Sequence, residues 1–119
     1  VRIGFKRVKP VNALLYFQFE QFKIINHVGA ARDKFLEAIA VAKKGDFEKA
    51  EKLLKEGEKQ FVLGHQAHTE LIQNDVRVQS VTMNLLLTHA QDQLMSAEGF
   101  KIIATEFIDV YKEFSKQNK

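Results

Sequence analysis

The scarcity of helix-breaking residues constrains the fold of this chain more than any other feature of its sequence. Its 119 residues include a single proline, Pro10, and six glycines. Because proline and glycine interrupt regular backbone structure most strongly, so few of them favour long helices. The length corresponds to one domain, and the 45% hydrophobic content is enough for a modest core. We therefore expect an all-α fold, an antiparallel three-helix bundle.

Apolar residues recur at helical spacing in three segments, and this recurrence sets the expected limits of the helices. The first helix is expected at about 19–44, where Gly45 ends it because glycine tolerates the left-handed backbone of a helix end. Asp46 can then cap a second helix at about 47–74 through its side-chain oxygen. A third helix is expected at about 80–116, with Ser80 as its cap.

The second helix carries the most regular apolar row of the chain, in alternating steps of three and four residues: Phe47, Ala50, Leu54, Gly57, Phe61, Gly64, His68 and Leu71. Gly57 and Gly64 each weaken an isolated helix by about 1 kcal/mol relative to alanine. Their place in a packed row predicts that a neighbouring backbone approaches closely there.

The third helix has more apolar residues than one packed row requires. One row reads Leu86, His89, Gln93, Ser96, Phe100, Ile103, Phe107, Val110 and Phe114; a second, about 60° around the helix, reads Leu85, Thr88, Asp92, Met95, Gly99 and Ile102. Because one face is enough to pack a helix into a three-helix subunit, the second row predicts contact between subunits.

The first eighteen residues differ from the rest and are expected to lie outside the three-helix domain, at 19–119. They hold four bases and no acid, and we interpret them as a vector-encoded leader or a native arm that docks on the bundle. The remainder has 14 of the 18 bases against all 15 acids. This near-neutral body argues against nucleic-acid binding.

Several classes of function are excluded by residues or patterns that the sequence lacks. With no cysteine there is no disulfide, thiolate nucleophile or cysteine-based zinc site. No Gly-x-Ser-x-Gly turn or phosphate-binding glycine loop occurs. No apolar run approaches the ~20 residues of a membrane span, and no signal peptide is recognisable, so a cytoplasmic protein is expected.

The candidate functional site is His89 with Asp92, one helical turn apart in a run otherwise apolar enough to be buried. Burying either group alone is costly, so the pair indicates a function. If Asp92 lines an oligomer axis, its copies converge and need a cation or shared protons. His65 and His68 share a helix face and could form a three-histidine zinc site with His89, although this spacing is weak evidence.

The third helix also carries the motif that points to a family, His89-Ala90-Gln91-Asp92-Gln93-Leu94-Met95. Further elements are His27-Val28-Gly29-Ala30-Ala31-Arg32, Lys44-Gly45-Asp46-Phe47, Gly64-His65 and Thr69-Glu70-Leu71-Ile72. With these elements the chain resembles the IIA component of the lactose/cellobiose (N,N′-diacetylchitobiose) class of the bacterial phosphoenolpyruvate-dependent sugar phosphotransferase system. The resemblance covers nearly all of residues 19–119.

The resemblance implies a phosphocarrier. His89 would accept a phosphoryl group on Nε2 from phosphorylated HPr, in a cleft between subunits, and pass it to a cysteine of the cognate IIB protein. Sugar would then be phosphorylated during import through the membrane permease IIC, the only link to a membrane. The family is a homotrimer of three-helix subunits with one divalent cation, expected to be Mg²⁺, held by the aspartate at the position of Asp92.

Gln91 and Gln93 are candidate donors to the phosphoryl group, Gln93 from one turn along the His89 face and Gln91 only by reaching around or across to another subunit. Gln93 departs from the family pattern, in which many members carry a second histidine. His68 also departs, because many members carry glutamine there, and we interpret it as a packed, hydrogen-bonded residue. His27 is interpreted as a surface or capping residue.

Two other functions remain open from the sequence. One is the histidine phosphotransfer module of a two-component relay, which is also a helical bundle with an exposed histidine. Those modules commonly place a lysine and a glycine soon after the histidine, and Ala90-Gln91-Asp92-Gln93 has neither. The other is a structural helical trimer in which His89 has no chemical role. The sugar that would be transported is not indicated.

Overall fold

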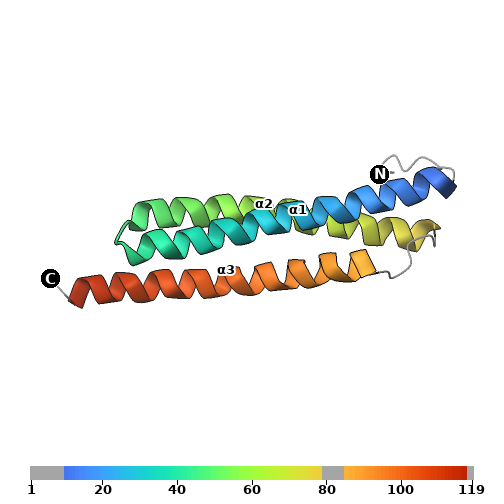
Figure 1. Cartoon of the computed structure of the whole chain (residues 1–119). Helices are drawn as coiled ribbons and strands as arrows, with labels where there is room; N and C mark the ends of the chain where they lie inside the picture. Colours follow the sequence, from blue (N-terminus) through green and yellow to red (C-terminus); the bar gives the residue numbers. More distant parts are fainter. Residues whose placement is uncertain (1–9, 79–84, 118–119) are drawn as a thin grey trace.

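The chain forms an antiparallel three-helix bundle in the computed structural model, which describes residues 10–78 and 85–117. The helices are α1 (Pro10–Lys43), α2 (Phe47–Val78) and α3 (Leu85–Gln117). Helices α1 and α3 run in one direction and α2 runs in the other, and α1 and α2 extend past the start of α3 (Figure 1). The expected all-α subunit is confirmed, as a rod with extents of 65 × 29 × 17 Å.

The connection between α1 and α2 is the predicted turn. Gly45 adopts a φ of 90°, in the left-handed region that favours glycine. Its N–H donates to the carbonyl of Ala42 at 2.9 Å, and the N–H of Asp46 donates to the carbonyl of Val41 at 3.0 Å. The Oδ1 atom of Asp46 accepts the N–H of Lys49 at 3.2 Å, so the predicted cap of α2 is confirmed.

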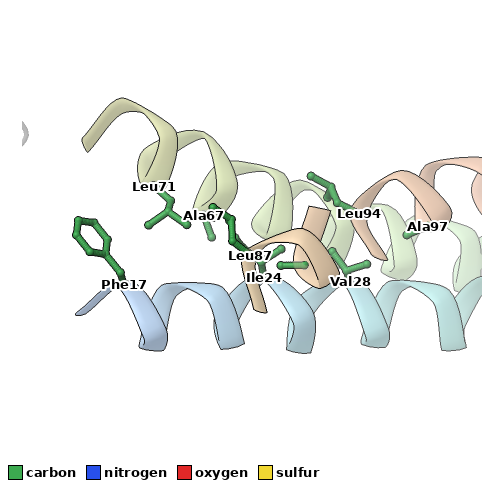
Figure 2. Close-up of a cluster of buried hydrophobic side chains, with 9 residues drawn as sticks. Phe17, Ile24, Val28, Ala67, Leu71, Leu87, Leu94 and Ala97 are labelled. Carbon is green, nitrogen blue, oxygen red and sulfur yellow. The ribbon is translucent and has the colours of Figure 1, made fainter. Parts of the chain in front are cut away.

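Helix α1 begins at Pro10, so the expected start at Phe19 is wrong. Proline suits the first position of a helix, where its missing N–H would have no intrahelical acceptor and its fixed φ is already helical. Phe17 is only 6% exposed and belongs to a core cluster with Leu71 of α2 and Leu87 of α3, shown in Figure 2. Residues 10–18 are therefore part of the bundle, whereas residues 1–9 and the expected cap Ser80 lie outside the described residues.

The two glycines of the α2 row mark a close contact with α1, as predicted. A Cβ atom at Gly57 would lie 2.6 Å from Cε1 of Phe35 and 3.2 Å from the carbonyl oxygen of Ala31. A Cβ atom at Gly64 would lie 2.9 Å from Cγ2 of Val28. Both glycines are buried, and a larger residue at either position would push the helices apart.

Helix α3 packs into the subunit through a row that was not predicted: Leu87, Ala90, Leu94, Ala97, Ala104 and Ile108, all less than 9% exposed. The expectation that the row containing His89 packs inside the subunit is wrong. Most of both predicted rows point outward, and seven of their large apolar residues are at least 45% exposed: Leu85, Met95, Ile102, Ile103, Phe107, Val110 and Phe114. We call these seven residues the outer face of α3.

The reason for this difference is side-chain size. Three of the six inner residues are alanines, which let α3 approach the other helices closely. Helix α1 contacts both other helices more extensively than they contact each other.

None of the helices in the described ranges is long and apolar enough to cross a membrane.

Candidate functional site

His89 lies near the start of α3 and is exposed, as is Asp92 one turn further on. Although the surrounding run is apolar, both side chains face away from the interior of the subunit. Within the part of the chain that the structure describes, the ring of His89 has no hydrogen-bond partner. An unpaired, exposed imidazole can be reached by another protein and can act as a nucleophile in its neutral form.

The two candidate glutamines lie on opposite flanks of α3. At about 100° per residue, Gln93 is only about 40° around the helix from His89, whereas Gln91 is about 200° away. Gln93 contacts α1 and Gln91 contacts α2, which places His89 on the α1 flank. Within one subunit, therefore, only Gln93 shares a face with His89.

Gln93 is fixed by an arginine from α1. The Nη1 atom of Arg32 donates to Oε1 of Gln93 at 3.2 Å, and both side chains are half-buried. The amide nitrogen of Gln93 stays available as a donor, with no partner among the described residues. Arg32 occurs in one of the motif segments, but no role was predicted for it, because its contact with Gln93 joins two helices and leaves no local sequence signal.

Gln91 is bonded to His68 of α2, with 3.1 Å between Nε2 of the amide and Nε2 of the ring. Because an amide nitrogen can only donate, the ring nitrogen is the acceptor, and His68 is neutral with its proton on Nδ1. Desolvation by burial, and then the charge of His65, lower the pKa of His68 below its usual value of 6.5. The interpretation of His68 as a packed, hydrogen-bonded residue is confirmed.

This histidine should make stability depend on pH. Because its pKa is lowered on folding, the unfolded chain binds the proton more readily, so stability is fully present above pH 6.5 and is lost as the pH falls through the lowered pKa. We expect the denaturant midpoint to fall between about pH 7 and about pH 5, and to fall less in His68→Gln. An equal fall in both proteins would show that other groups cause it.

Asp92 faces away from the subunit core. It lies about 200° around α3 from the buried Ala90, and Leu85 and Met95 on the same side are 88% and 71% exposed. No group of three or more histidine, aspartate or glutamate side chains that could hold a metal ion exists among the described residues. The three-histidine zinc site is therefore not formed there.

His27 does not match its interpretation as a surface or capping residue. It is half-buried, and its Nδ1 lies 2.9 Å from Oε1 of Gln60 in α2. Since that oxygen can only accept, Nδ1 carries the proton and donates it. The side chain therefore joins α1 to α2. His65, in contrast, is exposed on α2.

Comparisons with known proteins agree with the resemblance carried by the His89 motif. Residues 20–112 match the family described as "PTS system, Lactose/Cellobiose specific IIA subunit". The lichenan-specific phosphotransferase enzyme IIA component of Bacillus subtilis is 43% identical over 96 residues, which are 81% of this chain and 87% of that protein. The lactose-specific EIIA component of Staphylococcus epidermidis is 33% identical over 94 residues, 79% of this chain and 90% of that protein.

A solved structure has the same fold. The crystal structure of the cellobiose-specific enzyme IIA from Bacillus anthracis superposes with a TM-score of 0.80 at 35% sequence identity, covering 84% of this chain and 92% of that chain. The family match over residues 20–112 includes the part of α3 that carries His89, Gln91, Asp92 and Gln93.

Proposed function

Because this chain belongs to the lactose/cellobiose-specific IIA family of the sugar phosphotransferase system, we propose that it carries a phosphoryl group on His89. The donor is phosphorylated HPr and the acceptor is a cysteine of the cognate IIB protein, in the cytoplasm. A β-linked disaccharide is then phosphorylated during uptake through IIC. The observation that carries this proposal is the exposed ring of His89 inside the family motif, with no hydrogen-bond partner among the described residues.

Phosphoryl transfer requires only a nucleophilic ring nitrogen and nearby donors that balance the charge of the phosphoryl group. The lone pair of Nε2 on neutral His89 attacks the phosphorus; the new N–P bond forms as the bond to HPr breaks, and that electron pair returns to the donor atom of HPr. In the second transfer the thiolate of IIB attacks the phosphorus. An S–P bond forms as the N–P bond breaks, and the electron pair of the N–P bond returns to Nε2. Since the group brings about −2 charge, nearby donors must balance it without holding it permanently.

A reconstituted transfer assay tests this function. Incubation with phosphoenolpyruvate, enzyme I and HPr should place phosphate on the protein that is labile in acid and stable in base, as expected of phosphohistidine. Adding IIB should then remove the label from this chain. A protein that takes no label, or holds it when IIB is added, would contradict the carrier role.

The outer face of α3 supports a homotrimer. Its seven large apolar residues lie along one side of one helix, and such a continuous exposed apolar surface is typical of an interface. Joining three subunits through it would bring three copies of Asp92 together. Their carboxylate oxygens suit Mg²⁺, which would offset the repulsion between them. One Mg²⁺ per trimer is thus part of the proposal, with Asp92 as the residue that would hold it.

Replacing Asp92 should remove the effect of the cation on assembly. Asp92→Leu is expected to form trimers with and without a chelator, because the desolvation and repulsion of three carboxylates disappear. The wild type should dissociate when chelator is added, measured as molar mass by light scattering. The matched control is Asp33→Leu, which removes an exposed aspartate from a different helix, α1. This variant should behave like the wild type. Wild-type trimers that do not respond to chelator would count against the metal.

A further inference from the structure

Arg32 of α1 sits beside the proposed phosphorylation site through its contact with Gln93. Its Nη1 donates to Oε1 of Gln93 at 3.2 Å, and Gln93 is the next residue along the face of His89, four positions on. Residues at this spacing are neighbours on a helix surface, with Cβ atoms about 5–6 Å apart. Gln93 is therefore a neighbour of His89 on the surface of α3 and is at the same time bonded to the guanidinium of Arg32.

An unrestrained glutamine beside a phosphoryl group would be ambiguous, because its amide has two different ends. The NH₂ end donates to phosphate oxygens, whereas the carbonyl end repels them. Arginine can only donate, so the contact with Arg32 holds the carbonyl of Gln93 on the α1 side. The end of the amide left free is the NH₂ group.

The charge of Arg32 is not neutralised by a carboxylate in the part of the chain that the structure describes. The five ion pairs there use Lys23, Lys34, Lys101, Lys112 and Lys116. Among the described residues, therefore, no carboxylate competes with Gln93 for the guanidinium of Arg32. Arg32 also polarises the amide of Gln93, because donation to the carbonyl oxygen strengthens the NH₂ group as a donor.

We propose that Arg32 is a positioning residue for phosphoryl transfer, which fixes Gln93 with its NH₂ group toward the phosphoryl group on Nε2 of His89. This inference rests on the proposed function and extends it to two residues of one subunit. It gives Gln93 the donor role and assigns the orientation of that donor to α1. Gln91, on the other flank and bonded to His68, has no part in this arrangement within the subunit.

The test compares Arg32→Met, Gln93→Leu and the double variant in single-turnover transfer from phosphorylated HPr. Loss of one donor to a developing anion costs about 10²–10³-fold at well-built sites. Since Gln93 without Arg32 still presents its NH₂ group part of the time, we expect about a tenfold slower transfer in Arg32→Met. The double variant should be no slower than Gln93→Leu, because Arg32 acts through Gln93.

A second readout separates positioning from simple stability. The half-life of isolated phosphorylated protein should shorten in Arg32→Met and recover in part in Arg32→Lys, since lysine keeps the charge and one donor but not the planar fork. Lys112→Met is the matched control. Like Arg32, Lys112 is a basic residue that contacts another helix, here through Glu51 of α2 at 2.7 Å. It lies far along α3 from His89, so its substitution should leave both readouts unchanged.

The outcomes distinguish the two proposals. If the wild type takes no label on His89, the carrier function and this inference both fail. If the wild type is labelled while folded Arg32→Met matches it in transfer rate and half-life, Arg32 has no positioning role and the carrier function stands. Independent, multiplicative losses in the double variant would likewise overturn the inference, because they would show that Arg32 does not act through Gln93.

Discussion

His89→Ala should lose phosphoryl acceptance from HPr, to below about a thousandth of the wild-type rate, because removing a nucleophile eliminates the covalent step rather than weakening it. The fold should persist, since the ring is exposed and has no partner among the described residues. Label incorporation from phosphoenolpyruvate measures the loss, and circular dichroism checks the helices.

The other three histidines provide the controls for this experiment. His65 is exposed on α2, while His27 and His68 join helices through Gln60 and Gln91. Each of these substitutions should leave a protein that is still phosphorylated, with phosphate that is stable in base. If label survives in His89→Ala and disappears in one of these variants, the acceptor is a different histidine and the site is misassigned.

The second large effect is expected at Gly57, on stability. In Gly57→Ala the new Cβ would lie 2.6 Å from Cε1 and 2.8 Å from Cδ1 of Phe35, whose side chain is fully buried. Overpacking of this kind costs about 1–3 kcal/mol and exceeds the gain of up to about 1 kcal/mol that alanine brings to a helix. We expect a net loss of about 1–2 kcal/mol in the free energy of unfolding, measured with denaturant.

Gly29 is the matched control for Gly57. A Cβ there would meet nothing within 4 Å, so Gly29→Ala should be neutral or stabilising by up to about 1 kcal/mol. Combining Gly57→Ala with Phe35→Leu should cost less than the sum of the two, because leucine lacks the ring atom that the new Cβ meets. Equal effects of the two alanine substitutions would show that α1 and α2 are less closely packed than described.

The sequence predicted those structural features that depend on residues close together in the chain. The turn at Gly45 and the cap by Asp46 involve neighbouring residues and were predicted correctly. The α2 row was also correct, because glycines at helical spacing indicate close packing whichever helix lies opposite. Pro10 was assigned to a leader or docking arm and not to the start of a helix, although a proline also suits the first residue of a helix.

The inner row of α3 could not be found by tracing large apolar residues. Ala90, Ala97 and Ala104 carry little hydrophobic signal, and the size of a packed residue depends on how near the opposite helix is. For the site, the motif identified His89 and the flanking glutamines. The contacts that hold those glutamines on different flanks of α3, with Arg32 and His68, join separate helices and required the structure.

The exposed position of His89 also limits how its partners can meet. Under the proposed function, the donor and acceptor proteins both need the same nitrogen, on one flank of one helix, and two folded proteins cannot occupy that space together. Binding of one partner would therefore exclude the other, and an excess of either unphosphorylated partner would slow turnover by competition. The turnover rate then depends on how fast each partner dissociates as much as on the rate of phosphoryl transfer.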